Sequence, residues 1–320
     1  MISVGVIGVG SMGRHHARVY RELPDAELVG VYDVDSEQAQ AVAAAHGTTP
    51  WPLDDLLETC DAVSIVVPTR FHREIAEAAI DAGTDILVEK PLAGTPDEAR
   101  AIVDAATDAG VTLQVGHIER FNPAVQAVAA FADDLDLIAL DTQRLGPPVD
   151  RDGDDGVVMD LMIHDIDVAR SLLGGEVVDV QATGTADGQY VAAALRFDSG
   201  VVATLTASRV THKKVRQLTL TADDCRVDVD YTTQDVAITR QTLPEYVTTN
   251  GGVRYRSETV VERPTVDNGE PLRRELESFV ESVGDGTEPE VTGEDGVRAL
   301  ELAARIADVV DSYGITDAVQ

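Results

Sequence analysis

The stretch "ISVGVIGVGSMGRHHARVYREL", residues 2–23, decides the fold of this chain. Its first seven residues are apolar and rich in β-branched side chains, a pattern that predicts a buried strand. A helical segment follows, and between the two Gly8, Gly10 and Gly13 form the pattern G-x-G-x-x-G. Gly8 permits a tight turn, Gly10 lets the backbone approach a pyrophosphate, and Gly13 allows close packing of helix on strand. The stretch therefore predicts a dinucleotide site.

The start of that helix and the next strand complete the predicted site. Backbone N–H groups near Ser11 and Met12 have no partner inside the helix, and the helix dipole favours phosphate there. The second predicted strand, residues 26–35, carries Asp33 twenty residues after Gly13. A carboxylate at this position accepts hydrogen bonds from both ribose hydroxyls and repels a 2′-phosphate. We expect NAD rather than NADP as the cofactor; a glycine-rich turn without a ligand is the alternative.

Strands and helices continue to alternate as far as residue 116. Strands are predicted at 61–67, 85–91 and 111–116, and helices at 73–83 and 96–110. This order is typical of a parallel sheet covered on both faces, which binds ligands at the carboxyl ends of its strands. The further cofactor contacts that we predict lie at those ends: Pro68, Thr69, His72, Glu89, Lys90 and His117. Thr69 could equally cap a helix, and His117 could be structural.

Lys90 is distinctive because the chain contains only two other lysines, Lys213 and Lys214. At the carboxyl edge of the sheet it would stand beside the nicotinamide half of a cofactor. The structural alternative is a loop lysine that extends into water. The scarcity of lysine favours a functional role.

The pattern changes after residue 121, where short strands are joined by turns such as "FDSG" and "TADD". Strands are predicted at 136–145, 177–186, 190–197, 201–210, 215–222 and 225–231, and "TTNGGVRY" at 248–255 indicates a hairpin. Few helices interrupt them, so the sheet should be antiparallel with one exposed face. The expected fold class is α/β. It combines an N-terminal Rossmann domain, a doubly wound parallel sheet over residues 1–120, with a C-terminal α+β domain over residues 121–320. The second domain carries an open, mostly antiparallel sheet, and its last helix could pack back on the first domain.

One segment, "GVVMDLMIHDIDVARSLLGG" at residues 156–175, combines a buried helix with a regular set of polar residues. Asp160, His164, Asp167 and Ser171 recur at steps of four, three and four, which aligns them on one side of a helix. A solvent face and a face lining a cleft give the same pattern, so periodicity leaves both interpretations open.

The composition is strongly acidic, with 57 Asp and Glu against 25 Lys and Arg and a formal net charge of −32. Such self-repulsion is screened in molar salt, so the acidic, lysine-poor chain resembles proteins of halophilic archaea; an acidic mesophilic protein is the alternative. No basic stripe exists to bind nucleic acid. Cys60 and Cys225 give neither a disulfide framework nor a metal spacing, and we predict no metal. Without a signal peptide or a membrane-length apolar run, a cytoplasmic, soluble protein is expected.

Five motifs together resemble the Gfo/Idh/MocA oxidoreductases: "GVGSMGRHHARVY", "VVPTRFH", "VEKPLAG", "VGHIERFNP" and "MDLMIHDID". The resemblance runs from residue 1 to about residue 210 and returns at residues 289–314. It implies a Rossmann domain followed by an open sheet that commonly pairs subunits, hence a homodimer or homotetramer. One departure is Asp155-Gly156, where family members often carry Gly-Gly.

The resemblance also implies catalytic residues, because the lysine of the EKP motif works in this family with an aspartate and a histidine of the later helix. These match Lys90, Asp160 and His164. The chemistry suits them, since a histidine can take the hydroxyl proton while hydride leaves for NAD⁺. Asp160 would orient the imidazole and Lys90 would stabilise the developing alkoxide. In some relatives the lysine is the base, and both assignments stay open.

The substrate predicted by the resemblance is a sugar, most similar to that of the nucleotide-sugar branch of UDP-N-acetylglucosamine 3-dehydrogenases. A diphosphate favours arginine forks, and the candidate substrate contacts are Arg120, Asn122, Arg144, Arg151 and Arg209. A free-sugar or inositol dehydrogenase shares the mechanism without the arginines. A glycoside hydrolase with tightly held NAD is a further alternative. A non-catalytic NAD-binding regulator would be expected to lose Lys90 or His164, and this chain keeps both.

Overall fold

The computed structural model describes residues 1–148, 156–241, 245–249 and 252–314. The chain divides into two compact units. The first comprises Met1–Phe121 with Gly269–Ala304, and the second comprises Asn122–Asn268 with Arg305–Gln320. The first unit therefore includes a segment from late in the sequence.

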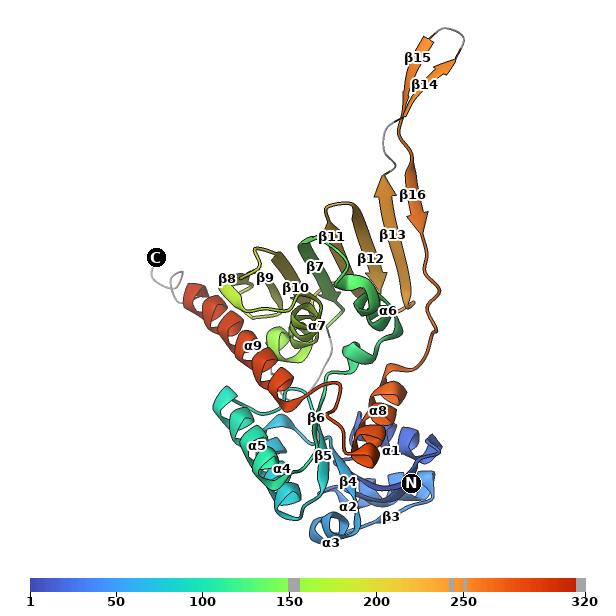
Figure 1. Ribbon diagram of the computed structural model, residues 1–320. Helices are drawn as coiled ribbons and strands as arrows, with labels where there is room; N and C mark the ends of the chain where they lie inside the picture. The colour runs from blue at the N-terminus through green and yellow to red at the C-terminus, as the bar shows by residue number, and fades with distance from the viewer. Residues whose placement is uncertain (149–155, 242–244, 250–251, 315–320) are drawn as a thin grey trace. The chain divides into compact units, whose positions relative to one another are not determined.

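The first unit is built on a six-stranded parallel sheet, which contains the five predicted strands and a short edge strand, β3, that was not predicted (Figure 1). The strand order is β3-β2-β1-β4-β5-β6. The strands are β1 (Ile2–Ile7), β2 (Ala26–Tyr32), β3 (Thr49–Pro50), β4 (Ala62–Ile65), β5 (Asp85–Glu89) and β6 (Leu113–Gly116). The order reverses between β1 and β4, and sheets of this kind bind ligands beyond the carboxyl ends of the strands at that point.

Helices connect these strands and cover the sheet. They are α1 (Gly13–Glu22), α2 (Ser36–His46), α3 (Leu53–Thr59), α4 (His72–Asp81) and α5 (Pro96–Ala109), with the short 3₁₀ turns η1 (Thr69–Phe71) and η2 (Ile118–Phe121). Side chains cap two of them: Asp35 accepts N–H bonds at the start of α2, and Thr95 does the same for α5. Such caps satisfy N–H groups that a helix cannot pair internally.

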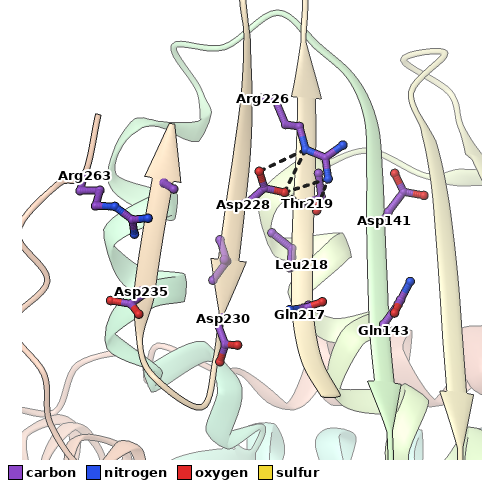
Figure 2. Close-up of a pocket in the computed structure, with 12 residues that line it drawn as sticks. Asp141, Gln143, Gln217, Leu218, Thr219, Arg226, Asp228, Asp230, Asp235 and Arg263 are labelled. Carbon is purple, nitrogen blue, oxygen red and sulfur yellow. Dashed lines mark hydrogen bonds and ion pairs between the residues drawn. The ribbon is translucent and has the colours of Figure 1, made fainter. Parts of the chain in front are cut away.

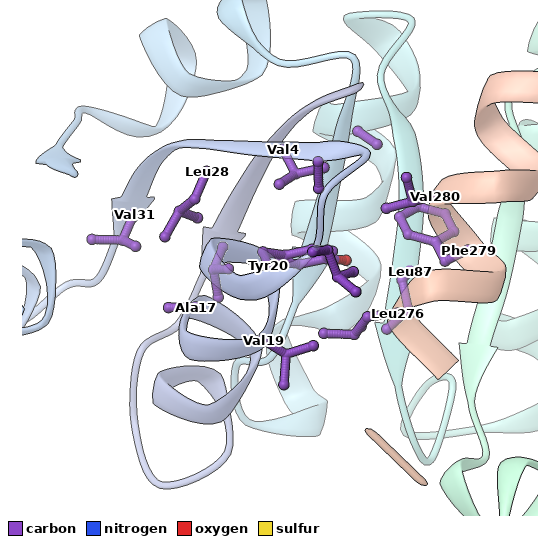
Figure 3. Close-up of a cluster of buried hydrophobic side chains, with 14 of the residues drawn as sticks. Val4, Ala17, Val19, Tyr20, Leu28, Val31, Leu87, Leu276, Phe279 and Val280 are labelled. Atoms are coloured by element: carbon purple, nitrogen blue, oxygen red, sulfur yellow. The ribbon is translucent and has the colours of Figure 1, made fainter. Parts of the chain in front are cut away.

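The core beside β1 is completed by α8 (Pro271–Asp285), which comes from the late segment (Figure 3). Its residues Leu276, Phe279 and Val280 pack in the cluster that contains Val4 and Tyr20. Phe279 and Tyr20 are both fully buried. The buried Tyr20 hydroxyl lies 2.7 Å from Ser64 Oγ, so its polar end has a hydrogen-bond partner.

The second unit carries an eight-stranded sheet in the order β16-β13-β12-β11-β7-β10-β9-β8. Its strands are β7 (Leu137–Leu145), β8 (Val177–Gly184), β9 (Tyr190–Phe197), β10 (Val202–Ser208), β11 (Val215–Ala222), β12 (Cys225–Asp230), β13 (Asp235–Gln241) and β16 (Thr259–Glu262). All neighbours are antiparallel except β10 and β7. The predicted hairpin is present as β14 (Glu245–Thr249) and β15 (Gly252–Arg256). Strands β13 and β16 were not predicted.

Helices contact this sheet through α6 (Pro123–Ala132) against β12 and β13, and α7 (Ile163–Leu173) against β7 and β10. Along β7 the residues Leu140, Thr142 and Arg144 are buried, whereas the alternate residues Asp141 and Gln143 are exposed. The exposed residues line a shallow polar pocket of about 520 Å³ (Figure 2). The expected alternation of a buried and a solvent-facing side is thus present.

The long helix α9 (Gly293–Gly314) is the last element in the described part of the chain. Within the described ranges, none of the helices has both the length and the apolar character that crossing a membrane requires. Nor do the described His, Cys, Asp and Glu residues form a group of three that could hold a metal ion. Cys60 and Cys225 are both buried and free.

Candidate active site

The glycine-rich turn after β1 has the geometry that a bound phosphate group needs. Gly8 has a φ of +85°, and a Cβ there would lie 2.7 Å from the Val66 carbonyl oxygen. A Cβ on Gly13 would lie 1.9 Å from the Gly8 carbonyl oxygen, so only glycine lets α1 start so close to the turn. At Gly10 the atom nearest to such a Cβ is Gln38 Nε2, 3.9 Å away. Two glycines are thus required by packing, and the third leaves open space.

The start of α1 faces the same turn and differs from that of α2 or α5. Its N-cap residue is Met12, whose side chain makes no capping hydrogen bond. Backbone N–H groups of an uncapped first turn, together with the helix dipole, favour an anion. The residues present therefore fit the pyrophosphate of a dinucleotide.

A cleft of about 430 Å³ lies beside the turn, within the size range of small-molecule sites. Four of the predicted cofactor contacts line it: Gly8, Gly10, Asp33 and Pro68. Its lining also includes side chains that the sequence analysis did not single out, Leu53, Arg70, Phe71 and Ile75. The lining also contains a second carboxylate, that of Glu74. Largely apolar walls with the Asp33 carboxylate beside the turn suit an adenosine, whose ring is flat and whose ribose carries hydroxyls.

Asp33 is held in place by the backbone around it. Its Oδ2 accepts the Val9 N–H at 2.8 Å, and its Oδ1 accepts the Asp35 N–H at 2.9 Å. A carboxylate oxygen has two lone pairs, so these bonds orient the group without using its full capacity. The carboxylate can therefore still accept hydrogen bonds from a ribose.

Glu89, at the end of β5, lies next to Lys90 and is held by a buried histidine of α1. His16 Nε2 donates to Glu89 Oε1 at 3.2 Å, and Glu89 Oε2 accepts the Lys90 backbone N–H at 3.2 Å. Burial by itself would raise the pKa of the Glu89 carboxyl, but the hydrogen bond from His16 and the charge of Lys90 outweigh it and lower that pKa. An ionised carboxylate therefore precedes the lysine.

On the other side of Lys90, the carbonyl of Pro91 is held by His72. The Nδ1 atom of His72 lies 2.9 Å from the Pro91 oxygen, and its Nε2 atom lies 2.8 Å from the Val67 oxygen. His72 is only 1% exposed. Burial lowers the pKa of His72, so the neutral ring carries one N–H and donates to one of these two carbonyls at a time. The ring lies between the loops after β4 and β5. His72 and His16 together fix the two residues that flank Lys90.

In the second unit, Asp160 and His164 lie where a π-helical turn, η3 (Val158–Met162), runs into α7. Both are half-buried, whereas Asp167 is 3% exposed and Ser171 is exposed. The four residues therefore do not form the uniform stripe that regular helical spacing predicted. Asp160 Oδ2 accepts a hydrogen bond from Arg209 Nη2 at 2.6 Å. Single π turns inside α-helices are frequent at functional sites because they redirect side chains.

Comparison with known proteins agrees with this architecture. Residues 2–117 match the family described as "Oxidoreductase family, NAD-binding Rossmann fold", and residues 139–229 match the "GFO/IDH/MocA C-terminal domain". Together the two matches span more than half of the chain. The chain belongs to the Gfo/Idh/MocA oxidoreductase family. The expected fold class and oxidoreductase activity are thereby confirmed.

Several members of the Gfo/Idh/MocA family align with almost the whole chain. UDP-N-acetylglucosamine 3-dehydrogenase of Acidithiobacillus ferrooxidans is 34% identical, covering 97% of both chains. An inositol 2-dehydrogenase of Rhizobium meliloti is 31% identical, covering 98% of this chain and 99% of its own. A crystal form of the Acidithiobacillus enzyme superposes with a TM-score of 0.88 at 33% identity, covering 98% of this chain and 99% of that one.

The residues predicted to bind substrate in this Gfo/Idh/MocA chain lie in different surroundings. Arg144 is buried and forms a two-pronged ion pair with Asp165, with N–O distances of 2.8 and 3.0 Å. Asn122 is also buried; it caps α6 and donates to the Tyr231 carbonyl at 3.1 Å. These contacts give both residues a structural role, and their contact with substrate stays a prediction.

The other arginines predicted to bind substrate have three different locations. Arg120 belongs to the first unit, where it donates to the Glu290 carbonyl at 3.4 Å. Arg151 lies outside the described residues. Arg209, by contrast, lines a pocket together with Asp160. Of the remaining cofactor candidates, Ser11 is exposed beside Met12, Thr69 begins η1, and His117 is 1% exposed just after β6.

The sequence analysis missed two residues of that same pocket, Lys214 and Arg216. The signal was available, because Lys213 and Lys214 are two of only three lysines and stand in the run "THKKVR", residues 211–216. The scarcity of lysine that favours a functional role for Lys90 applies equally to Lys214.

Proposed function

We propose that this chain is an NAD-dependent dehydrogenase that oxidises a secondary hydroxyl of a nucleotide-linked sugar to a ketone. The observation that carries this proposal is the alignment with UDP-N-acetylglucosamine 3-dehydrogenase, which is 34% identical over 97% of both chains. The nearly full-length match includes both the cofactor half and the substrate half. A 3-keto sugar would be the product.

NAD is the proposed cofactor because Asp33 lines the cleft beside the glycine-rich turn. Its fixed carboxylate would accept ribose hydroxyls and would repel the 2′-phosphate of NADP. Bound there, NAD⁺ would supply the acceptor for hydride. Gly10 and the first turn of α1 would hold the pyrophosphate.

The proton chemistry is assigned to the chain's own side chains. His164 would take the hydroxyl proton, since an imidazole with a pKa near neutrality suits a general base. Lys90 would stabilise the negative charge that develops on that oxygen. Arg209 holds Asp160, one turn before His164, through a 2.6 Å ion pair. Lys90 as the base is the alternative assignment.

A second candidate substrate is a free sugar or an inositol. It is favoured by the 31% identity with inositol 2-dehydrogenase over 98% of this chain. The two candidates share the mechanism and differ in whether the substrate carries phosphate.

The test is a screen for NADH absorbance with UDP-sugars, free aldoses and inositols, each with NAD and with NADP in molar KCl. We expect turnover with a UDP-N-acetylhexosamine and NAD. Turnover with inositol or free glucose, and none with UDP-sugars, would move the assignment to the second candidate. Tight NAD binding with no turnover of any substrate would support a regulator instead. Isolation of the keto product would exclude transient oxidation during glycoside hydrolysis.

The proposal extends to the setting of the enzyme. We infer a salt-adapted protein from the net charge of −32 and the three lysines, and we propose separately that it acts in the cytoplasm. We also infer a homodimer or homotetramer that pairs through the exposed sheet face drawn in Figure 2. Sedimentation in molar KCl checks the second point, and a monomer would contradict it.

A further inference from the structure

The residue in the middle of the glycine-rich turn, Val9, has its backbone held by two side chains. Asp33 Oδ2 accepts the Val9 N–H at 2.8 Å, and Gln38 Nε2 donates to the Val9 carbonyl at 2.9 Å. Val9 is 0% exposed, and buried backbone groups need hydrogen-bond partners. The turn lies beyond the end of β1, where strand pairing no longer supplies them. Side chains from the end of β2 and the start of α2 supply them instead.

The bond from Gln38 fixes the orientation of one particular peptide group, that between Val9 and Gly10. This peptide is trans. In a planar trans peptide the carbonyl and the following N–H point in opposite directions. Because the Val9 carbonyl points to Gln38, the Gly10 N–H points away from it. Among the hydrogen bonds of the described residues none uses that N–H, so it is oriented toward an acceptor that a ligand can supply.

The start of α2 carries Gln38 on an anchored backbone. The Asp35 side chain accepts the N–H groups of Glu37 and Gln38 at 3.0 and 3.3 Å. The Asp35 N–H is itself bonded to Asp33 Oδ1 at 2.9 Å. These bonds use only the backbone of Gln38. Its side-chain amide can therefore be replaced without removing the cap that starts the helix.

The Gln38 amide also borders the space that Gly10 leaves open. Apart from chain neighbours, its Nε2 is the one atom of the described chain that would lie within 4 Å of a Cβ on Gly10, at 3.9 Å. An acceptor such as the Val9 carbonyl requires the nitrogen end of the amide, which carries two N–H groups. The atom nearest the open space is thus a donor without negative charge, as a neighbouring pyrophosphate requires.

We propose that Gln38 is a positioning residue for the dinucleotide. By holding the Val9 carbonyl, its amide turns the Gly10 N–H toward the pyrophosphate. The inference rests on the proposed function and deepens it, because it assigns part of the cofactor site to a residue outside the G-x-G-x-x-G pattern. Asp33 acts from the other side of Val9, so its carboxylate both holds the turn and accepts the ribose hydroxyls.

The kinetic test compares two glutamines of α2. Gln38→Met removes the amide and keeps the length of the side chain, whereas Gln40→Met makes the same change at an exposed residue. We expect Gln38→Met to raise the KM for NAD about three- to tenfold, as loss of one hydrogen bond does. The kcat at saturating NAD and the KM for the sugar should stay at the wild-type level. Mere loss of stability would instead lower the apparent kcat and leave the KM for NAD unchanged.

A second variant, Gln38→Glu, keeps the shape of the side chain and removes its N–H groups. A carboxylate oxygen at this position repels both the Val9 carbonyl and the pyrophosphate. We expect Gln38→Glu to lose more NAD affinity than Gln38→Met does. An NAD affinity of Gln38→Glu equal to that of the wild type would contradict the proposal.

Binding of cofactor fragments locates the effect on the phosphates. ADP and adenosine are measured by displacement of NADH fluorescence from the wild type, Gln38→Met and Gln40→Met in molar KCl. We expect Gln38→Met to weaken ADP binding about three- to tenfold and to leave adenosine binding unchanged. Gln40→Met should match the wild type for both fragments.

The other outcomes separate this inference from the proposed function. Equal affinities of the two methionine variants for NAD and ADP would overturn the role of Gln38 and leave the proposed function standing. An equal loss for ADP and adenosine would also overturn it, because the effect would then lie at the base or the ribose. If the wild type binds neither NAD nor ADP, the cofactor site and the proposed function both fail.

Discussion

At the scale of the residue, the sharpest prediction concerns His164. His164→Ala should lower kcat by about 10²- to 10⁴-fold, the usual contribution of a general base. The dissociation constant for NAD should not change, because the cleft that Gly8, Asp33 and Pro68 line belongs to the other unit. Stopped-flow turnover and fluorescence titration of NAD measure the two quantities.

The matched control is His46→Ala, at the end of α2, which should leave both quantities at the wild-type level. Parallel loss of turnover and NAD affinity in His164→Ala would indicate a structural histidine. If kcat falls only in Lys90→Met, while His164→Ala keeps a kcat near that of the wild type, Lys90 is the base.

Individual residues were predictable where a local motif decides their surroundings. Gly8, Gly13 and Asp33 follow from the spacing of one turn and one strand, and the structure gives each a contact that explains it. Arg144 was not predictable in this way. Its ion pair is made with Asp165, 21 residues on in a different element, and only the tertiary fold brings the two together.

At the scale of the element, the glycine-rich turn permits a test with two similar substitutions. Gly13→Ala introduces a Cβ 1.9 Å from the Gly8 carbonyl oxygen, a backbone clash that α1 must move to relieve. We expect a lower melting temperature together with loss of NAD binding. Gly10→Ala places its Cβ in open space and should keep the wild-type melting temperature while weakening NAD binding.

Thermal unfolding with and without NAD distinguishes the two variants. NAD should raise the melting temperature of the wild type and should raise that of Gly10→Ala less, because stabilisation by a ligand depends on its affinity. Equal NAD-induced shifts in Gly10→Ala and wild type would show that the open space beside Gly10 is not where the pyrophosphate lies.

Elements with a strong period were predicted well, and those without one were not. Most strands of both sheets that alternate or run apolar were found from the sequence, β13 being an exception, whereas α2 is built largely from alanine and polar residues and has no clear apolar side. The π turn η3 was equally hidden, since its residues are ordinary helix formers. The burial of Asp167 three residues after a half-exposed His164, both in α7, likewise depends on what packs against the helix in the folded chain.

At the scale of the whole molecule, the net charge of −32 predicts a strong dependence of stability on salt. The melting temperature should rise from low salt to molar KCl by more than the roughly 2–4 °C that 1 kcal/mol produces in a chain of this size class. Differential scanning calorimetry across a KCl series measures it. An uncharged osmolyte at equal osmolality is the control. A flat response to KCl would contradict salt adaptation.

The fold class could be predicted at this scale because a dinucleotide motif and a change from helix-strand alternation to short strands are both visible in one sequence. The membership of α8 in the first unit could not be predicted from the sequence. Residues 271–285 read as an amphipathic helix, and nothing in that pattern tells which apolar surface Phe279 will cover.

That membership of α8 has a consequence for how the protein is made. On the ribosome, the strands and helices of residues 1–121 emerge first, but the side chains that seal them, Leu276, Phe279 and Val280, are translated more than 150 residues later. The nascent chain therefore leaves apolar side chains of β1 and α1 uncovered while residues 122–268 of the second unit are synthesised. Completion of the core beside β1 must therefore wait until α8 has been synthesised.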